Sequence, residues 1–184
     1  MANDTTNLDT SNLDTPNLLE INDLKVYFDT MDGTVRAVDG VDFAIQPGRT
    51  LGLVGESGCG KSVTAATILR LLPKRTSRIA DGEILYNDGN GQSVDMTKLN
   101  PDGAVIRAIR GNDISMIFQE PLTSLSPVYT VGSQIAEAVQ LHQSVGRQEA
   151  RERTIEILGL VGIPNAAERF DEYPHQFSGG MRQR

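Results

Sequence analysis

Polar and apolar residues alternate along much of the first half of the chain, and this pattern predicts β-strands. The apolar positions begin at Leu18 and predict strands over 18–28, 35–38, 41–45 and 82–86. Turn signals at Asp32-Gly33 and Pro47-Gly48 separate the segments. We therefore expect several short strands with one buried face each.

Two other strands are predicted by continuous apolar runs. Thr50–Val54 and Ile114–Phe118 show no alternation, which is typical of strands buried on both faces of a parallel sheet. Helical periodicity predicts helices over 62–72, 131–145 and 147–161. The first of these helices has one apolar side and is expected to end at a proline: Ala65, Ile68, Leu69, Leu72 and Pro73. Strands that alternate with helices in this way favour an α/β fold.

Composition narrows the possible roles of the chain. Residues 1–17 carry a polar, acidic repeat, Asn-Leu-Asp-Thr, and are predicted to be a disordered tail before a domain over 18–184. The 24 acidic residues exceed the 17 Lys and Arg, so a general nucleic-acid-binding role is not expected. Cys59 is the single cysteine, which excludes an internal disulfide. No apolar run approaches the roughly 18 residues of a membrane span, and residues 1–7 do not resemble a signal peptide.

A phosphate-binding loop follows the first continuous apolar run. Its residues are Gly55, Glu56, Ser57, Gly58, Cys59, Gly60, Lys61 and Ser62. Glycines let backbone N–H groups curl around an anion, and the start of the next helix adds unpaired donors. Lys61 would reach the β- and γ-phosphates, and the Ser62 hydroxyl would bind Mg²⁺. The alternative is a glycine-rich turn with a chance lysine, and the strand-loop-helix context argues against it.

Two further motifs limit the class of phosphate-loop protein. Gln119 ends the second predicted buried strand, where its side chain would orient water or bind Mg²⁺ near the γ-phosphate. Ser178-Gly179-Gly180 precedes a basic helical start, which would form a second anion site. Taken singly, Gln119 could be structural and the Ser-Gly-Gly segment could be a capped helix.

In this order and at these separations, the three motifs resemble those of the ATP-binding cassette (ABC) transporter ATPases. The phosphate loop resembles the Walker A motif, Gln119 the Q-loop, and Phe177–Gln183 the ABC signature. Two stretches are similar to those of the oligopeptide, dipeptide and nickel importer ATPases: Glu120–Pro127, followed by Val131-Gly132 and Gln134-Ile135, and Tyr173–Met181. The family more often has Asn where this chain has Ser126.

The resemblance implies a fold and a set of roles. The fold is a P-loop NTPase core with an N-terminal antiparallel β portion and a helical signature subdomain at about residues 130–177. Lys61 and Gln119 are the implied catalytic residues, and Ser62 and Gln119 the implied Mg²⁺ ligands. The implied ATP-binding residues are those of the loop, Ser178, Gly179, Gly180, and Phe28 stacked on adenine, with Tyr27 as the alternative.

The resemblance also implies partners and a location. A second ATPase subunit would close its signature over nucleotide held by this loop, and transmembrane permease subunits would contact the segment after Gln119. A solute-binding protein would be an indirect partner. The subunit would lie peripherally at the cytoplasmic face of the cell membrane and power import of peptides or similar small solutes.

Two alternatives remain open at the level of the sequence. In the family, a strand ending in Asp and Glu follows the signature, and the sequence ends at Arg184, within that motif. We therefore expect the 184 residues to be a C-terminally truncated fragment that holds ATP but hydrolyses it poorly alone. One alternative is a nucleotide-binding or regulatory module without turnover. The other is a different P-loop enzyme such as a small-molecule kinase, which would leave the Ser178–Gly180 segment unexplained.

Overall fold

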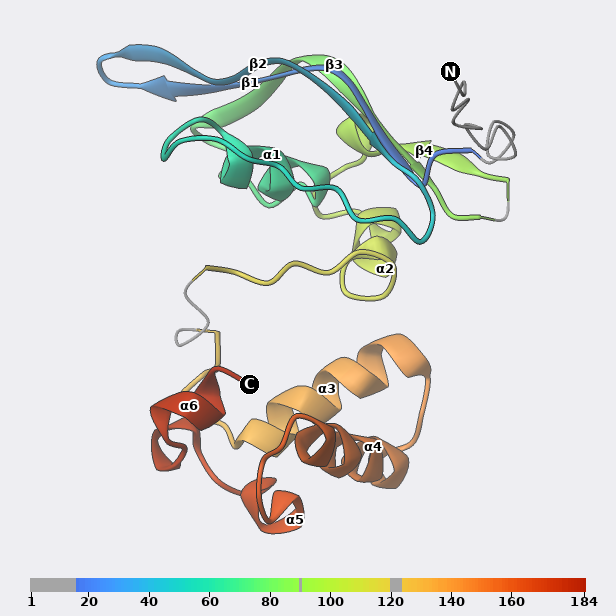
Figure 1. The fold of residues 1–184 in the computed structure, drawn as a ribbon, viewed down its shortest axis with the longest axis vertical. Helices are drawn as coiled ribbons and strands as arrows, with labels where there is room; N and C mark the ends of the chain where they lie inside the picture. Colours follow the sequence, from blue (N-terminus) through green and yellow to red (C-terminus); the bar gives the residue numbers. More distant parts are fainter. Residues whose placement is uncertain (1–15, 90, 120–123) are drawn as a thin grey trace, which may run out of the picture. The chain divides into compact units, whose positions relative to one another are not determined.

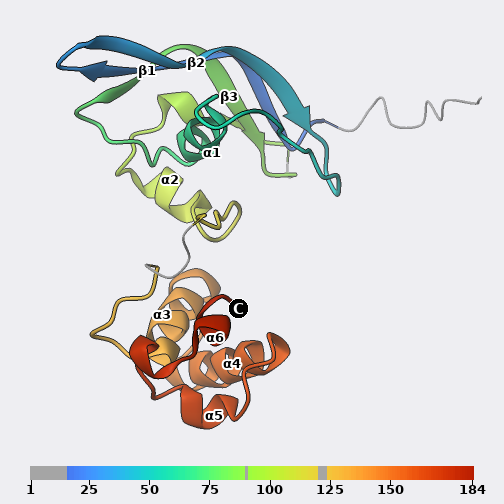
Figure 2. The same cartoon turned by 60° about the vertical axis from the view of Figure 1, so that its left-hand side comes forward.

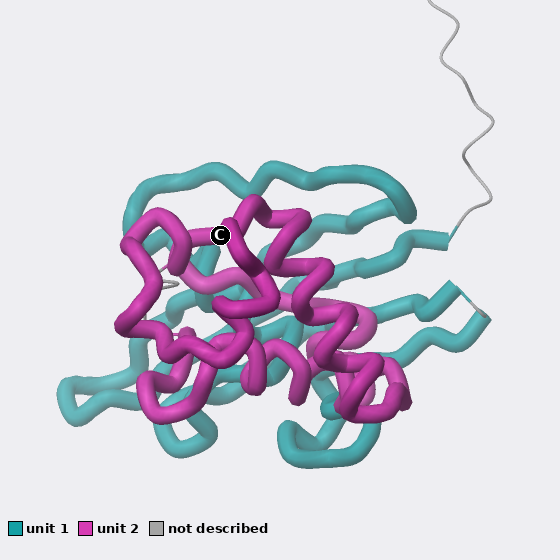
Figure 3. Tube along the Cα trace, turned by 90° about the horizontal axis from the view of Figure 1, so that it is seen from below, with its two compact units in different colours: residues 1–107 teal, residues 108–184 magenta. Residues whose placement is uncertain are grey.

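The computed structural model describes residues 16–89, 91–119 and 124–184, which belong to two compact units (Figure 3). Unit 1 is residues 1–107 and unit 2 is residues 108–184. Most of the predicted tail over 1–17 lies outside the described residues, and so does part of the importer-like stretch, residues 120–123.

Unit 1 is built on an antiparallel sheet of four strands in the order β2-β1-β3-β4 (Figure 1). The strands are β1 (Leu19–Thr30), β2 (Gly33–Ile45), β3 (Ser77–Asn87) and β4 (Ser93–Asp95). The short segments η1 (Met96–Lys98) and α2 (Ala104–Ile109) follow. The predicted strands over 18–28 and 82–86 are thus confirmed, and the predicted antiparallel β portion is present.

The hairpin of β1 and β2 follows from its turn residues and its alternation. Its strands pair from Thr30 opposite Gly33 to Leu19 opposite Ile45, so the chain reverses at Met31 and Asp32. The segments predicted separately over 35–38 and 41–45 form one strand, because register shifts in the pairing with β1 absorb the break in alternation. Buried apolar residues from the strands form the core of the sheet: Leu19, Ile21, Leu24, Val26, Val38, Ile84 and Tyr86.

Helix α1 (Lys61–Ile68) lies along one face of this sheet (Figures 1 and 2). The helix is shorter than the predicted 62–72, because Arg70 takes a left-handed conformation with φ of 54°. The N–H of Leu71 then bonds the carbonyl of Ala66 at 2.9 Å and closes the helix end. Its buried residues are Thr64 and Thr67, whose hydroxyls bond helix carbonyls one turn earlier.

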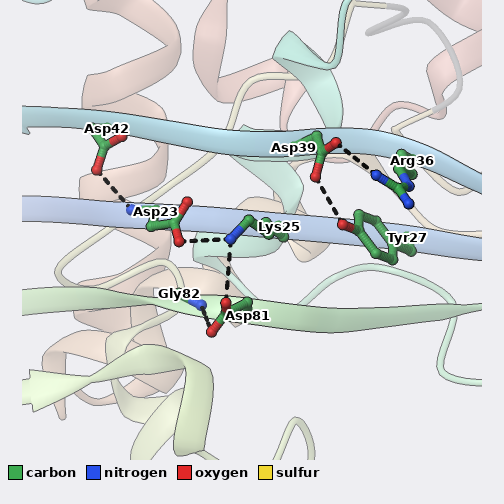
Figure 4. A network of polar contacts seen from close by, with 8 residues as sticks. All are labelled: Asp23, Lys25, Tyr27, Arg36, Asp39, Asp42, Asp81 and Gly82. Carbon is green, nitrogen blue, oxygen red and sulfur yellow. Dashed lines mark hydrogen bonds and ion pairs between the residues drawn. The ribbon is translucent and has the colours of Figure 1, made fainter.

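Charged side chains form a network across β1, β2 and β3 (Figure 4). Lys25 Nζ lies 2.6 Å from Asp23 Oδ2 and 3.2 Å from Asp81 Oδ2. On the neighbouring strand pair, the Tyr27 hydroxyl donates to Asp39 Oδ1 at 2.8 Å. The guanidinium of Arg36 lies over the Tyr27 ring at 5.5 Å and that of Arg78 at 5.3 Å. The network joins all three long strands through side chains as well as through the backbone.

These contacts shift the acid–base behaviour of the network. The hydrogen bond from Tyr27 lowers the pKa of Asp39, and the same bond raises the pKa of the Tyr27 phenol. The backbone N–H of Gly82, together with Lys25, lowers the pKa of Asp81. Hydrogen bonds to Asp23 and Asp81 raise the pKa of Lys25. These pKa shifts favour the ionised forms of Asp39, Asp81 and Lys25.

Unit 2 is helical. Its two long helices, α3 (Val131–Gln143) and α4 (Arg147–Leu160), lie side by side (Figures 1 and 2). They are followed by α5 (Ala166–Arg169), η3 (Pro174–Gln176) and α6 (Gly179–Arg182). The helices predicted over 131–145 and 147–161 are confirmed. A buried apolar cluster holds the unit together: Val131, Leu158, Ile163 and Phe177.

The two predicted buried strands are not formed. Thr50–Val54 has no strand assignment, and Val54 is 95% exposed; Ile114–Phe118 has only an isolated bridge from Ile114 to Arg110, and Ile117 is 93% exposed. A strand buried on both faces needs a hydrogen-bonded neighbour on each side and a layer above and below. Apart from the Arg110–Ile114 bridge, no described strand pairs with either segment. Among the same described residues, no helix is long and apolar enough to cross a membrane.

Candidate nucleotide-binding site

The phosphate loop, Gly55–Ser62, leads directly into α1. Gly60 is the N-cap of the helix and has φ of 91°, a conformation that side chains with a Cβ rarely adopt. A Cβ on Gly60 would also overlap the carbonyl oxygen of Ala37 on β2. Both the backbone conformation and the close approach therefore require glycine at position 60. The close approach also fixes the loop against the antiparallel sheet.

Lys61 lies over the loop that it follows. Its ammonium donates to the carbonyl oxygen of Gly55 at 2.7 Å and to that of Glu56 at 2.6 Å, and it lies 3.3 Å from Cys59 Sγ. The Lys61 ammonium is thus held against the loop backbone, and α1 with its first-turn N–H groups starts at the same residue. Backbone donors of a helix start together with an ammonium form the arrangement that binds phosphate oxygens.

The residues expected to contact Mg²⁺ are accessible in their own units. Ser62 is exposed at the start of α1 in unit 1, and Gln119 is exposed in unit 2. No group of three His, Cys, Asp or Glu side chains that could hold a metal ion occurs among residues 16–89, 91–119 and 124–184. A loop serine, nucleotide phosphates and water fit Mg²⁺, which keeps several waters and takes few protein ligands.

The two candidate adenine-stacking residues lie on opposite faces of β1, because neighbouring strand residues alternate. Phe28 shares its face with the fully buried Val26 and is itself half-buried. Tyr27 faces the charged network, where its hydroxyl bonds Asp39 and its ring contacts Arg36 and Arg78. Tyr27 is thus committed to contacts within the sheet.

The Ser178–Gly180 segment begins α6 in unit 2. The Ser178 hydroxyl accepts from the N–H of Met181 at 3.3 Å, as expected of a helix N-cap. Its flanking Phe177 is buried in the apolar cluster, which anchors the segment. A Cβ on Gly179 or Gly180 would meet no atom within 4 Å. The conformation of the chain therefore does not itself require glycine at these two positions.

The predicted site residues are divided between the two units, and the residues of the phosphate loop lie together in unit 1. Phe28 belongs to unit 1 with the loop, whereas Gln119 and Ser178–Gly180 belong to unit 2. Sequence reasoning missed two contacts that hold these groups in place: the backbone of Ala37 against Gly60, and the hydrogen bond from the Ser126 N–H to the Gln134 side chain. The sequence offers a glycine in the loop for the first contact and, for the second, the place of Gln134 in the importer-like stretch, but neither signal names the contacting group.

Comparison with known proteins identifies the family. A family model described as ABC transporter matches residues 38–184. The chain belongs to the ABC transporter family. The match decides between a transporter ATPase and the small-molecule kinase considered from the sequence, and it confirms the family resemblance.

Curated relatives narrow the likeness within the ABC transporter family. The chain is 51% identical over 166 residues to the "Probable peptide ABC transporter ATP-binding protein y4tR" of Sinorhizobium fredii, covering 90% of this chain and 48% of the relative. It is 48% identical, with the same coverage, to the "Dipeptide transport ATP-binding protein DppD" of Bacillus subtilis. The chain spans about half the length of the curated relatives it matches.

Solved structures confirm the fold. A dimeric post-hydrolysis structure of the ATP-binding cassette MJ0796 bound to ADP and Pi matches with a TM-score of 0.71 and 22% identity, covering 90% of this chain and 65% of that one. At this identity the match speaks for the ABC ATPase fold alone. The predicted fold class is thus confirmed, although two of its predicted strands are not formed among the described residues.

Proposed function

We propose that the chain is the nucleotide-binding part of an ATPase subunit that powers import of peptides or similar small solutes. The observation that carries the proposal is the loop itself: Lys61 is held over the Gly55–Gly60 backbone at the start of α1. The likeness to peptide-transport ATP-binding proteins supports the choice of solute class.

In this proposal, ATP binds with its phosphates on the loop. Lys61 exchanges its contacts with the Gly55 and Glu56 carbonyls for the β- and γ-phosphates, and Ser62 contacts Mg²⁺. Gln119 orients water or contacts the ion at the γ-phosphate, and Phe28 stacks on the adenine. Positioning and charge neutralisation by these groups are the protein's contribution to phosphoryl transfer.

The Ser178–Gly180 segment serves a second ATPase subunit. A helix start with a capping hydroxyl and two glycines offers close backbone approach to the phosphates of a nucleotide on the partner's loop. The open space beside Gly179 and Gly180 supports this role, because no contact with the described residues of the chain accounts for the glycines. Permease subunits and, indirectly, a solute-binding protein complete the proposed complex at the cytoplasmic face of the membrane.

The 184 residues by themselves are proposed to bind ATP with little turnover. The family's acidic residues that hold Mg²⁺ and polarise the attacking water follow the signature, and the chain spans 48% of the curated relatives' length. Without a general base, much of the rate enhancement of phosphoryl transfer is lost. The rival function, a regulatory module that binds without hydrolysis, makes the same prediction for this chain but not for the subunit that carries it.

The first test is ATP binding by Lys61→Met. Removing a charge-assisted contact to phosphate is expected to weaken ATP binding about 10- to 100-fold, measured by titration with a fluorescent ATP analogue and Mg²⁺. Lys74→Met is the matched control, because Lys74 pairs with Asp102 at the surface of unit 1. Equal affinity of the two variants would contradict the proposed site, and phosphate release measured beside binding separates an ATPase from a binding module.

A further inference from the structure

The side chain of Gln134 on α3 holds the loop that precedes the helix. Its Oε1 accepts from the N–H of Ser126 at 2.8 Å. Its Nε2 lies 3.0 Å from the Ser126 carbonyl oxygen and 3.1 Å from that of Tyr129, with the Thr130 carbonyl oxygen at 3.4 Å. All four partners are backbone groups of Ser126–Thr130, here called the Ser126 loop.

These bonds are not needed to start the helix. The Thr130 hydroxyl already accepts from the N–H of Ser133 at 3.3 Å. The N–H groups of Val131 and Gly132 donate to the carbonyls of Glu172 and Phe170 at 2.8 and 3.0 Å. Since the first N–H groups of α3 have these partners, the Gln134 amide serves the loop instead. It bonds both the N–H and the carbonyl of Ser126, as a neighbouring strand would.

The Ser126 loop joins a buried anchor to an exposed pair. Leu125, just before it, packs against the apolar cluster that includes Phe177, and Met181 of the signature helix α6 packs against the same cluster. Val128 and Tyr129, within it, are 69% and 62% exposed. A loop with large apolar side chains turned to solvent needs fixed backbone bonds to keep one conformation.

We propose that Gln134 is a positioning residue that fixes the Ser126 loop for contact with a permease subunit. This inference rests on the proposed function and deepens it, because it names the residue that shapes the contact. Gln134 acts through the loop backbone: it sets the direction of Val128 and Tyr129, and Leu125 ties the same loop to the cluster beneath the signature helix. Its side-chain hydrogen bonds within the described residues all go to Ser126, Tyr129 and Thr130, and none goes to a proposed nucleotide-binding residue.

The experiment uses the ATPase subunit carrying these residues, alone and reconstituted with its permease subunits in liposomes. Gln134→Met keeps the length of the side chain and removes its hydrogen bonds, and Gln134→Glu keeps an acceptor for the Ser126 N–H. Gln140→Met is the control, because Gln140 is an exposed residue on the same helix.

Gln134→Met is expected to raise the amide exchange rate of Ser126 about fivefold, the effect of losing one hydrogen bond. Gln134→Glu is expected to restore this protection only in part, because its second carboxylate oxygen would face the carbonyl oxygens of Ser126 and Tyr129 in place of a donor. Basal kcat and KM for ATP are expected to stay within about twofold, while stimulation by the permease falls about fivefold or more, in line with a coupling mutation. Gln140→Met is expected to change neither.

Three results would overturn the inference: unchanged Ser126 exchange, faster exchange with full permease stimulation, or a basal rate that falls in parallel with the stimulated one. The last would make Gln134 a residue of general stability. Failure of the proposed function is seen separately, in the unaltered subunit, as no ATP binding or no stimulation by the permease, and the inference then fails with it.

Discussion

Two glycines of the phosphate loop are required for different structural reasons, which the sequence alone does not show. Gly58 and Gly60 both have positive φ, 84° and 91°, within the same phosphate loop. A Cβ on Gly58 would meet no atom within 4 Å, whereas one on Gly60 would overlap the backbone of Ala37. A side chain at Gly58 would therefore cost only backbone strain, whereas a side chain at Gly60 would cost backbone strain and a steric clash.

Gly60→Ala is expected to destabilise unit 1 more than Gly58→Ala. Left-handed backbone alone costs a non-glycine residue about 1–2 kcal/mol, and the overlap with Ala37 adds about 1–3 kcal/mol in Gly60→Ala only. Urea unfolding without nucleotide measures both variants. Equal destabilisation would show that the loop moves away from β2 at no cost, contrary to the packing described.

At the scale of elements, the start of α3 is packed against the backbone and ring of Phe170. A Cβ on Gly132 would overlap both. The Phe170 ring is itself held, since it is buried and the Arg151 guanidinium lies over it at 4.6 Å. By contrast, a Cβ on Gly159 of α4 would meet nothing within 4 Å.

A glycine-to-alanine substitution is therefore expected to raise the stability of unit 2 on α4 and to lower it on α3. Gly159→Ala gains helix propensity and should stabilise unit 2 by about 0.5–1 kcal/mol. Gly132→Ala gains as much but forces Phe170 to move, with a net loss of about 1–2 kcal/mol. Thermal unfolding followed by circular dichroism compares them. A stabilised Gly132→Ala variant would mean that Phe170 can repack freely.

The sheet is expected to weaken in acid through its carboxylates. The bond from Tyr27 lowers the folded-state pKa of Asp39, so its contribution to stability is complete above the ordinary carboxyl pKa of about 4. That contribution is lost as the pH falls through the lowered folded-state pKa. Asp81, held by Gly82 and Lys25, behaves in the same way.

Tyr27→Phe removes the hydroxyl and keeps the ring beneath Arg36 and Arg78. The pKa of Asp39 is expected to rise toward its ordinary value, and the stability difference between neutral and acidic pH is expected to shrink. NMR titration of the Asp39 carboxyl and unfolding at several pH values measure the two effects. Tyr129→Phe is the control, because Tyr129 is exposed and belongs to unit 2, whereas the network belongs to unit 1. An unchanged Asp39 titration in Tyr27→Phe would contradict the assignment.

At the scale of the whole molecule, sequence reasoning succeeded where the signal was local. The β1–β2 hairpin follows from alternation and the turn at Asp32-Gly33, and α3 and α4 follow from periodicity and the break at Gly146. The phosphate loop was predicted from its spacing and its strand-loop-helix context; the helix after it is present as α1, whereas the strand before it is not formed. Each of these depends on residues that are close together in the sequence.

Predictions failed where burial depends on distant partners. The runs at Thr50–Val54 and Ile114–Phe118 have the composition of central strands, but composition does not supply neighbours. Thr50–Val54 is exposed throughout, and Ile114–Phe118 is exposed except at the half-buried Ile114 and Met116. The short elements β4, α2, α5 and η3 were missed because three to six residues give too few periods to recognise. The importer likeness includes Gln134, but its hydrogen bonds to Ser126 were missed because backbone partners leave no pattern in the sequence.

The two exposed apolar runs have a consequence for handling the protein. Each is five residues without a charge, rich in residues that favour extended chains, and each follows directly on a charged residue, Arg49 or Asp113. Such charges act as gatekeepers that oppose stacking of identical segments between molecules. In concentrated solution, these runs are the expected sites of self-association, and Ile117→Lys is expected to delay the onset of light scattering. No delay would place the adhesive surface elsewhere.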